Sequence, residues 1–253
     1  MNTTNLQGKI AFITGGARGI GLETARGLAR LGATVVIGAR NPEKAYGAAD
    51  QLRKEGLQAV SIPFDVTAHR DHEEAYRYFE DNFSRLDILI NNAGVLLDQE
   101  SISVQTVNRT SILSSKNLRD TFEVNFFSLI ELTQTLLPLI RRSEGGRIVN
   151  LSSVLGSLAV QADPSSPYYP IKTFAYNASK AALNAFTIHL AAELKDTNIK
   201  VNSVHPGWVR TELGGQYADM DEAAGAETSI LLASITKDGP TGGFFHKDTT
   251  VPW

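Results

Sequence analysis

Cysteine is absent from this sequence, and so are long apolar runs and blocks of like charge. Without cysteine the chain has no disulfide, no thiolate nucleophile and no cysteine-ligated metal, and a reducing compartment suits it. No apolar run reaches the 18 residues of a membrane-spanning helix, and residues 1–8 lack the charged and apolar pattern of a secretory signal. We therefore expect a cytoplasmic protein that has no membrane partner.

The charges also limit the partners of the chain. Its 24 basic and 27 acidic residues give a net charge of −3 and form no long run of one sign, so we expect no nucleic-acid partner. Of five histidines, only His69 and His72 share helical spacing, and no third ligand lies near them in the sequence. We expect surface histidines, no metal site and a small-molecule partner.

The pattern of apolar residues predicts an α/β fold. Short β-branched runs alternate with helical segments, and 253 residues with 42% apolar content can form one domain spanning 1–253. Right-handed crossovers between such units give a Rossmann-type, doubly wound parallel sheet of about seven strands with helices on both faces. The expected strands are 9–14, 34–38, 59–64, 86–91, 147–151, 200–205 and 243–246, and the expected helices are 20–31, 42–55, 70–83, 118–142 and 176–195.

Three segments are expected to cover a substrate. Residues 95–116 and 154–175 show neither helical nor strand period, and both follow the carboxyl ends of strands, where open α/β sheets bind ligands. Residues 207–225 follow the sixth strand in the same way. We expect all three segments to border the mouth of one site.

A glycine-rich turn follows the first predicted strand and leads into a helix. Gly15, Gly19 and Gly21 allow a tight turn and a close approach to a pyrophosphate, whose charge would meet the free amides of the helix N-terminus. A glycine cluster by itself often marks only a turn, but the strand before this cluster and the helix after it favour a dinucleotide site. We include Ile20 among its cofactor-binding residues.

The end of the second predicted strand distinguishes NADP from NAD. An NAD site presents a carboxylate there to the ribose, but this chain reads Gly38-Ala39-Arg40 and has no acid before Glu43. The Arg40 guanidinium can pair with a 2′-phosphate, and Arg18 could add to the same positive pocket. Although Arg40 could be only a solvated charge, the missing acid favours NADP(H) over NAD(H).

Several further motifs carry a family resemblance over nearly the whole chain. They are Thr14-Gly15-Gly16-Ala17-Arg18-Gly19-Ile20-Gly21, Asp65-Val66, Asn91-Asn92-Ala93-Gly94, Asn125, Ser152-Ser153, Tyr176-Asn177-Ala178-Ser179-Lys180 and Pro206-Gly207-Trp208-Val209-Arg210-Thr211. In this order they resemble the short, single-domain branch of the short-chain dehydrogenase/reductase family. The resemblance implies hydride transfer between a nicotinamide cofactor and a carbonyl or alcohol.

Tyr176 and Lys180 are spaced to share one helix face. Tyrosine ionises near pH 10, so acid/base work near neutrality needs a pKa lower by about 3 units, or roughly 4 kcal/mol. A buried ammonium together with a positive nicotinamide ring shifts the pKa in that direction. A surface helix with a solvated lysine is the alternative, but the preceding strand that ends in Ser152-Ser153 favours a catalytic pair.

The resemblance also implies roles for individual residues. Tyr176 is the general acid/base, Ser153 hydrogen-bonds the substrate oxygen in preference to Ser152, and Lys180 reaches the nicotinamide ribose. Asn125, which taken alone most often faces solvent, would bend its helix and hold a water linked to Lys180. The implied cofactor contacts come from Asp65 and Val66 to the adenine, from Asn92, Ala93 and Gly94 to the adenosine ribose, and from Pro206, Gly207, Val209 and Thr211 to the nicotinamide.

The chain departs from the family pattern in length. Twenty-two residues separate Ser153 from Tyr176, and the interval from Gly94 to Asn125 is also long. This is similar to carbonyl-reductase-like members, in which such an insertion covers a helix face that others use to tetramerise, so a monomer, dimer or tetramer remains open. A silent NADP(H) sensor or scaffold is the alternative function, disfavoured because the set Asn125, Ser153, Tyr176 and Lys180 is intact. An isomerase or dehydratase of the longer branch is disfavoured because no substrate domain follows Thr211.

Overall fold

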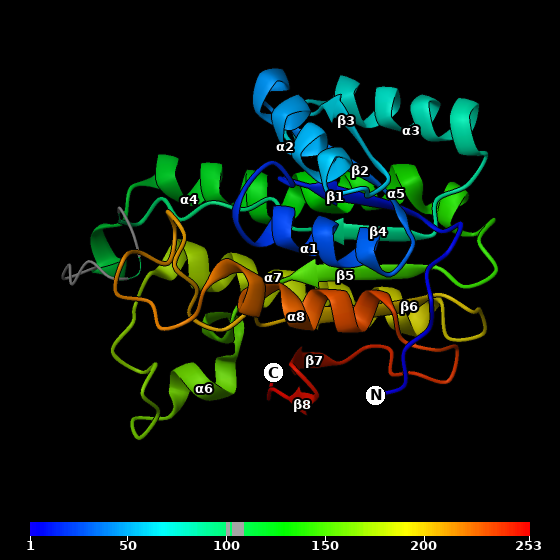
Figure 1. Cartoon of the computed structure of the whole chain (residues 1–253). Helices are drawn as coiled ribbons and strands as arrows, with labels where there is room; N and C mark the ends of the chain where they lie inside the picture. Colours follow the sequence, from blue (N-terminus) through cyan, green and yellow to red (C-terminus); the bar gives the residue numbers. More distant parts are fainter. Residues whose placement is uncertain (100–101, 103–108) are drawn as a thin grey trace.

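The computed structural model describes residues 1–99, 102 and 109–253 (Figure 1). The expected loop at 95–116 therefore lies partly outside the described residues. The strands are β1 (Ile10–Thr14), β2 (Thr34–Ala39), β3 (Ala59–Pro63), β4 (Ile88–Asn91), β5 (Arg147–Leu151), β6 (Lys200–Val204), β7 (Phe244–His246) and β8 (Thr249–Thr250). The helices are α1 (Gly19–Arg30), α2 (Pro42–Lys54), α3 (His69–Phe83), α4 (Ser115–Phe122), α5 (Ser128–Ile140), α6 (Leu158–Ala162), α7 (Phe174–Glu193) and α8 (Glu222–Ala233).

The strands form one sheet in the order β3-β2-β1-β4-β5-β6-β7-β8. All neighbours are parallel except β7 and β8, which pair antiparallel. The chain order reverses between β1 and β4, which is the switch point at which doubly wound sheets bind ligands. The predicted Rossmann-type sheet is confirmed, with eight strands where about seven were expected.

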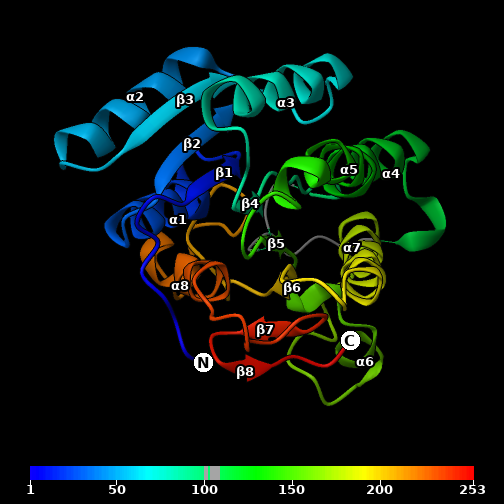
Figure 2. The same cartoon turned by 90° about the vertical axis from the view of Figure 1, so that its right-hand side faces the viewer.

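Helices cover both faces of this sheet, as Figure 2 shows end-on. One apolar cluster joins the sheet to α1, α2 and α8 through residues such as Leu28, Leu52 and Leu232. A second cluster joins the other face to α3, α5 and α7 through Phe79, Leu136 and other residues. These two cores fix the strand ends on which the site depends.

A buried chain of polar side chains crosses the second half of the sheet. The Asn91 amide donates to Thr133 Oγ1 at 3.0 Å and to Asn150 Oδ1 at 2.9 Å. The Asn150 amide donates to Thr187 Oγ1 at 2.8 Å, and that hydroxyl lies 2.8 Å from Ser203 Oγ. Asn91, Asn150 and Ser203 are register partners on β4, β5 and β6. This polar chain fixes the register of the three strands, and it bonds β4 to α5 and both β5 and β6 to α7.

The helices differ from the prediction in three places. The expected helix 118–142 is divided into α4, a π-helical turn at Glu123–Phe127, and α5. The short helix α6 forms within the expected loop 154–175. Helix α8 was not predicted, because its small and apolar residues surround it instead of forming one stripe; it packs so closely on α1 that a Cβ at Gly27 would lie 2.2 Å from Ile230 Cδ1.

Candidate active site

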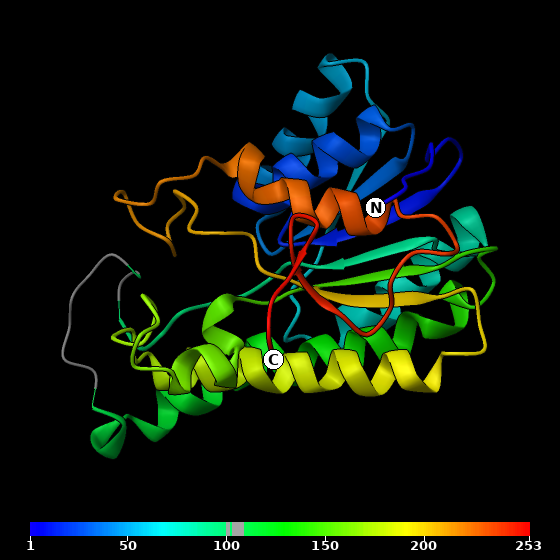
Figure 3. The same ribbon diagram turned by 90° about the horizontal axis from the view of Figure 1, so that it is seen from below.

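The segments that follow β4, β5 and β6 gather at one end of the sheet, which is at the left in Figures 1 and 3. A cavity of about 780 Å³ opens there. The expected residues that line it are Ile20, Asn92, Gly94, Ser152, Ser153, Tyr176, Lys180, Pro206, Gly207, Val209 and Thr211, and all three expected loops contribute further residues. The structure therefore brings Ser153, Tyr176, Lys180 and the nicotinamide-side candidates to one cavity, whereas Asn125 is buried behind its wall.

Tyr176 lies in the first turn of α7, and its side chain is buried. In the protein alone, burial raises the pKa of Tyr176 to about 12, and a hydrogen bond with Ser153 partly opposes that rise. Ser153 lies two residues beyond the end of β5, and its Oγ also accepts the Leu155 backbone amide at 3.2 Å. Lowering the tyrosine pKa therefore needs positive charge beyond what this environment supplies.

Lys180 lies one turn further along α7 and is buried as well. Its Nζ donates to the Leu151 carbonyl at 2.7 Å and lies 5.7 Å from the centre of the Tyr176 ring. Burial lowers the pKa of Lys180 to about 8. A Cβ at Gly156 would lie 2.8 Å from the Lys180 carbonyl carbon, so the turn after β5 packs directly on α7.

Asn125 lies in the π-helical turn and is fully buried instead of facing solvent. Its Oδ1 accepts the Val95 amide at 2.8 Å, and its Nδ2 donates to the Val95 carbonyl at 2.9 Å and to Ser179 Oγ at 3.0 Å. Asn125 Oδ1 and Lys180 Nζ both approach Gly94, each 3.4 Å from where a Cβ would stand. The π turn thus brings Asn125 next to the lysine.

The glycine-rich turn has the backbone that a phosphate cradle needs. Gly15 has a φ of +63° and Gly19 one of +60°, values that L side chains rarely adopt. A Cβ at Gly21 would lie 2.6 Å from the Gly15 carbonyl oxygen. Helix α1 has no side-chain cap and no acidic residue in its first turn, so its first amides remain free to meet an anion.

The two candidate phosphate-binding arginines differ in their surroundings. Arg40 is exposed at the end of β2 and forms no ion pair with the described residues. Arg18 forms an ion pair with Glu212, which lies in the 207–225 segment. Arg18 therefore joins the glycine turn to that segment in the free protein, and Arg40 remains the available cation.

The other expected cofactor contacts lie along the same edge of the sheet. Asp65 Oδ1 accepts both the amide and the hydroxyl of Thr67, and Val66 beside it is buried. The Asn92 side-chain Nδ2 donates to the carbonyls of Thr14 and Gly15, at 2.8 and 3.1 Å. The Asn92-Ala93-Gly94 strip is thereby tied to the glycine turn.

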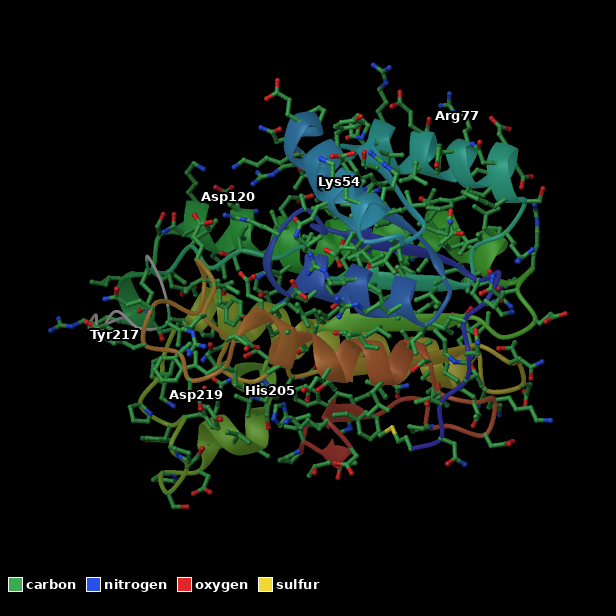
Figure 4. All side chains as sticks on the ribbon, in the orientation of Figure 1. Lys54, Arg77, Asp120, His205, Tyr217 and Asp219 are labelled. Carbon is green, nitrogen blue, oxygen red and sulfur yellow. The ribbon has the colours of Figure 1, made fainter. Side chains whose placement is uncertain are left out.

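The segment after β6 turns back over the cavity. Gly207 has a φ of +90°, and Val209 is buried and forms a β-bridge with Met220. The Trp208 indole donates a hydrogen bond to the Gly214 carbonyl at 2.8 Å. Tyr217, near the middle of this segment, is exposed at the edge of the molecule (Figure 4). The segment is therefore folded on itself with its first residues in the cavity wall.

Two histidines contradict the expectation of surface positions. His72 is 1% exposed, and its Nε2 lies 2.7 Å from the Val66 carbonyl beneath the predicted adenine contact. His205 lines the cavity at the end of β6 (Figure 4), where burial and the neighbouring His246 lower its pKa to about 3. Sequence signals for both positions exist: His205 directly follows a strand, and His72 is spaced at i, i+3 and i+7 with Ala75 and Phe79, the other buried residues of α3.

Residues 9–222 match the family model described as short chain dehydrogenase. The chain belongs to this family. A cyclopentanol dehydrogenase from Comamonas sp. (strain NCIMB 9872) is 34% identical over 218 residues, which are 86% of this chain and 80% of that protein. Salutaridine reductase from Papaver somniferum is 26% identical with a TM-score of 0.79, covering 94% of this chain and 99% of that one. The NADP complex of RhlG from Pseudomonas aeruginosa is 28% identical with a TM-score of 0.77, covering 96% of each chain.

Membership of the short-chain dehydrogenase family makes the chain an oxidoreductase of the alcohol and carbonyl class. It also accounts for the glycine turn beside the switch point, since the family uses nicotinamide cofactors. No helix in the described part of this short-chain dehydrogenase is long and apolar enough to cross a membrane.

Proposed function

We propose that the protein is an NADP(H)-dependent oxidoreductase that interconverts a ketone or aldehyde with its alcohol. One observation carries this proposal: the Tyr176 hydroxyl, hydrogen-bonded to Ser153 and followed one turn later by Lys180, is buried in the wall of a cavity that the glycine turn also reaches. A nucleotide sensor has no use for such a buried phenol. The alternative, a silent sensor or scaffold, therefore has no specific observation in its favour.

NADP(H) fits the residues at the switch point. The free amides of α1 suit the pyrophosphate, and Arg40 suits a 2′-phosphate because it is exposed and has no carboxylate at the strand end beside it. The similar structure of RhlG is a complex with NADP. When bound, NADP(H) supplies or accepts the hydride. Asp65, Val66, Asn92, Ala93 and Gly94 would hold the adenosine half, and Pro206 to Thr211 the nicotinamide half.

The proton is handled by this chain's own residues. In reduction Tyr176 donates its phenolic proton to the carbonyl oxygen, and Ser153 donates a hydrogen bond to the same oxygen as negative charge develops there. The Lys180 ammonium, with the positive nicotinamide ring, would offset the burial that holds the Tyr176 pKa near 12. In alcohol oxidation the same groups act in reverse, and Asn125 would hold the water that exchanges the proton.

The cavity wall favours an apolar substrate of moderate size. Beyond Tyr176 it is formed largely by side chains such as Val154, Leu155, Tyr168, Ile171 and Leu213. No aspartate or glutamate is among the described residues that line it. Because the Comamonas relative is named for cyclopentanol, we propose cyclic ketones and their secondary alcohols as the first class to test.

The test is a turnover assay with NADPH and with NADH. Cofactor oxidation is followed across cyclopentanone, cyclohexanone, substituted cyclic ketones, aryl ketones and aldehydes, with the Tyr176→Phe variant as control. Turnover with NADPH that the variant lacks supports the proposal. If no carbonyl, and no alcohol in the reverse direction, is converted by a protein that binds NADPH, the sensor takes its place.

A further inference from the structure

The first turn of α7 carries Tyr176 but has no cap of its own. The amides of residues 174–176 have no partner within the helix, as at any helix start. Thr173 stands at the cap position, yet its side chain makes no cap; its hydroxyl donates instead to Asn177 Oδ1 at 2.8 Å. The helix that positions the proposed acid therefore depends on another segment for its N-terminus.

Asp98 supplies the missing cap from the segment after β4. Its Oδ2 accepts the Ala175 amide at 2.9 Å, and its Oδ1 accepts the amide of Tyr176 itself at 3.0 Å. Each carboxylate oxygen holds one amide, which fixes the carboxylate in one orientation. Its negative charge also suits the positive end of a helix.

The segment that carries Asp98 is itself held in place. Asn125 bonds both the amide and the carbonyl of Val95, and the Asn117 side chain donates to the Leu97 carbonyl at 2.8 Å. The carboxylate is therefore presented by a fixed strip of backbone. That strip continues directly from Asn92-Ala93-Gly94, which is tied to the glycine turn.

We propose that Asp98 is a positioning residue for Tyr176, an inference that rests on the proposed function. The backbone at 176 sets the direction of the phenol, whereas Lys180 is anchored separately on the Leu151 carbonyl. Without Asp98 the first turn of α7 frays, and the Tyr176 hydroxyl loses its fixed place relative to Ser153 and Lys180. A shift of about 1 Å in a reacting group can slow a reaction roughly a hundredfold.

The test uses two variants and a matched control. Asp98→Ala removes both bonds, and Asp98→Asn keeps one oxygen for one of the two amides. Thr197→Val is the control, because the Thr197 hydroxyl donates to the Leu194 carbonyl at 2.7 Å and accepts the Ile199 amide at 3.2 Å just beyond the other end of the same helix. Helix α7 has 20 residues, so this end is about 30 Å away.

Three readouts are taken on the full-length protein: amide hydrogen exchange across 174–177, kcat and KM for NADPH with cyclohexanone, and the solvent deuterium isotope effect on kcat. In Asp98→Ala we expect exchange to rise about fivefold or more, kcat to fall at least about tenfold at unchanged KM for NADPH, and the isotope effect to increase. The exchange rate, kcat and isotope effect of Asp98→Asn should lie between those of the wild type and of Asp98→Ala. Thr197→Val should lose about as much thermal stability as Asp98→Ala, with none of these three effects.

The outcomes separate the two proposals. Unchanged exchange in Asp98→Ala overturns the role of Asp98 whether or not the protein turns over ketones. Raised exchange with unchanged kcat and isotope effect also overturns it, since the cap would then be merely structural. A wild-type protein that is inert toward every carbonyl and alcohol, with exchange raised in the variant, refutes the proposed function but leaves Asp98 holding the Tyr176 amide.

Discussion

Replacing Tyr176 by Phe is the sharpest test of the proposed chemistry, because it removes one oxygen from a buried ring. The phenol is neutral in the free protein, since burial holds its pKa near 12. Its loss therefore removes no charge and only one hydrogen bond, that with Ser153. Ser153 Oγ keeps the Leu155 amide as a partner. We expect the free energy of unfolding to fall by about 1 kcal/mol, which for a chain of this size lowers Tm by roughly 2–4 °C.

The effect on catalysis should be far larger. General acid/base catalysis contributes about 10²- to 10⁴-fold, so the barrier should rise by roughly 3–5 kcal/mol. NADPH affinity should stay nearly unchanged, because the glycine turn and Arg40 are untouched. Steady-state turnover with a ketone that the wild type reduces, fluorescence titration with NADPH, and thermal unfolding together measure the three expectations. A folded variant that keeps more than about a tenth of kcat would refute the role of Tyr176.

Three further predictions concern charge. Arg40→Asp should shift the ratio of kcat/KM for NADPH and NADH toward NADH by at least tenfold, about 1.4 kcal/mol, and an unmoved ratio would mean that another group reads the 2′-phosphate. Burial lowers the pKa of Lys180 to about 8, so kcat/KM for NADPH in carbonyl reduction should fall above about pH 8 as the ammonium loses its proton. A kcat/KM profile that stays flat from about pH 7 to pH 10 would contradict this role of Lys180. Asp87 is buried, and although desolvation alone would raise its pKa, hydrogen bonds from Ser143 and Ile10 with nearby Lys9 and Arg85 give a net lowering. Its contribution to stability is therefore present above the ordinary carboxyl pKa of about 3.9 and is lost as pH falls below that value. Asp87→Asn should be less stable than the wild type at neutral pH and should lose less Tm on acidification. Equal losses of Tm in both proteins would count against this linkage between the Asp87 pKa and stability.

The parallel sheet could be predicted from the sequence because its strands are buried on both sides. Segments such as β1 and β4 read as short apolar runs, and their observed bounds differ from the expected ones by only one or two residues. Several predicted motifs lie together at one edge of the sheet, because parallel strands bring their carboxyl ends to the same edge. Ser153, Tyr176 and Lys180 reach one cavity as a consequence.

Features that depend on contacts between distant segments could not be predicted. The π turn at Asn125 has no signal in the local residues, which are compatible with one continuous helix, and only the family resemblance indicated a bend there. Helix α8 depends on a fit between Ile230 and Gly27. Asp98 was no candidate, since nothing in the sequence connects it with an amide 78 residues away. The cytoplasmic location, the oligomeric state and the preference for NADP(H) stay predictions.

The insertion before Tyr176 bears on the oligomeric state. Its helix α6 lies against the start of α7, where Gln161 Oε1 accepts a hydrogen bond from Asn177 at 3.2 Å. Further along α7, Ile188 is 40% exposed. The insertion thus occupies one end of the helix, and light scattering in solution is the direct measure of whether copies associate.

The polar chain from Thr133 through Asn91, Asn150 and Thr187 to Ser203 has a consequence for folding. Parallel strands pair late, because each pairing must close a long loop first. A strand that slipped by one residue would turn Asn91 or Asn150 to the opposite face and leave an amide without a partner in an apolar layer, a cost of about 1–3 kcal/mol for each. Intermediates with a shifted strand register are thereby destabilised before the helices pack on the sheet. The side-chain amides that fix the register in the folded protein therefore also favour the intermediate with the correct register.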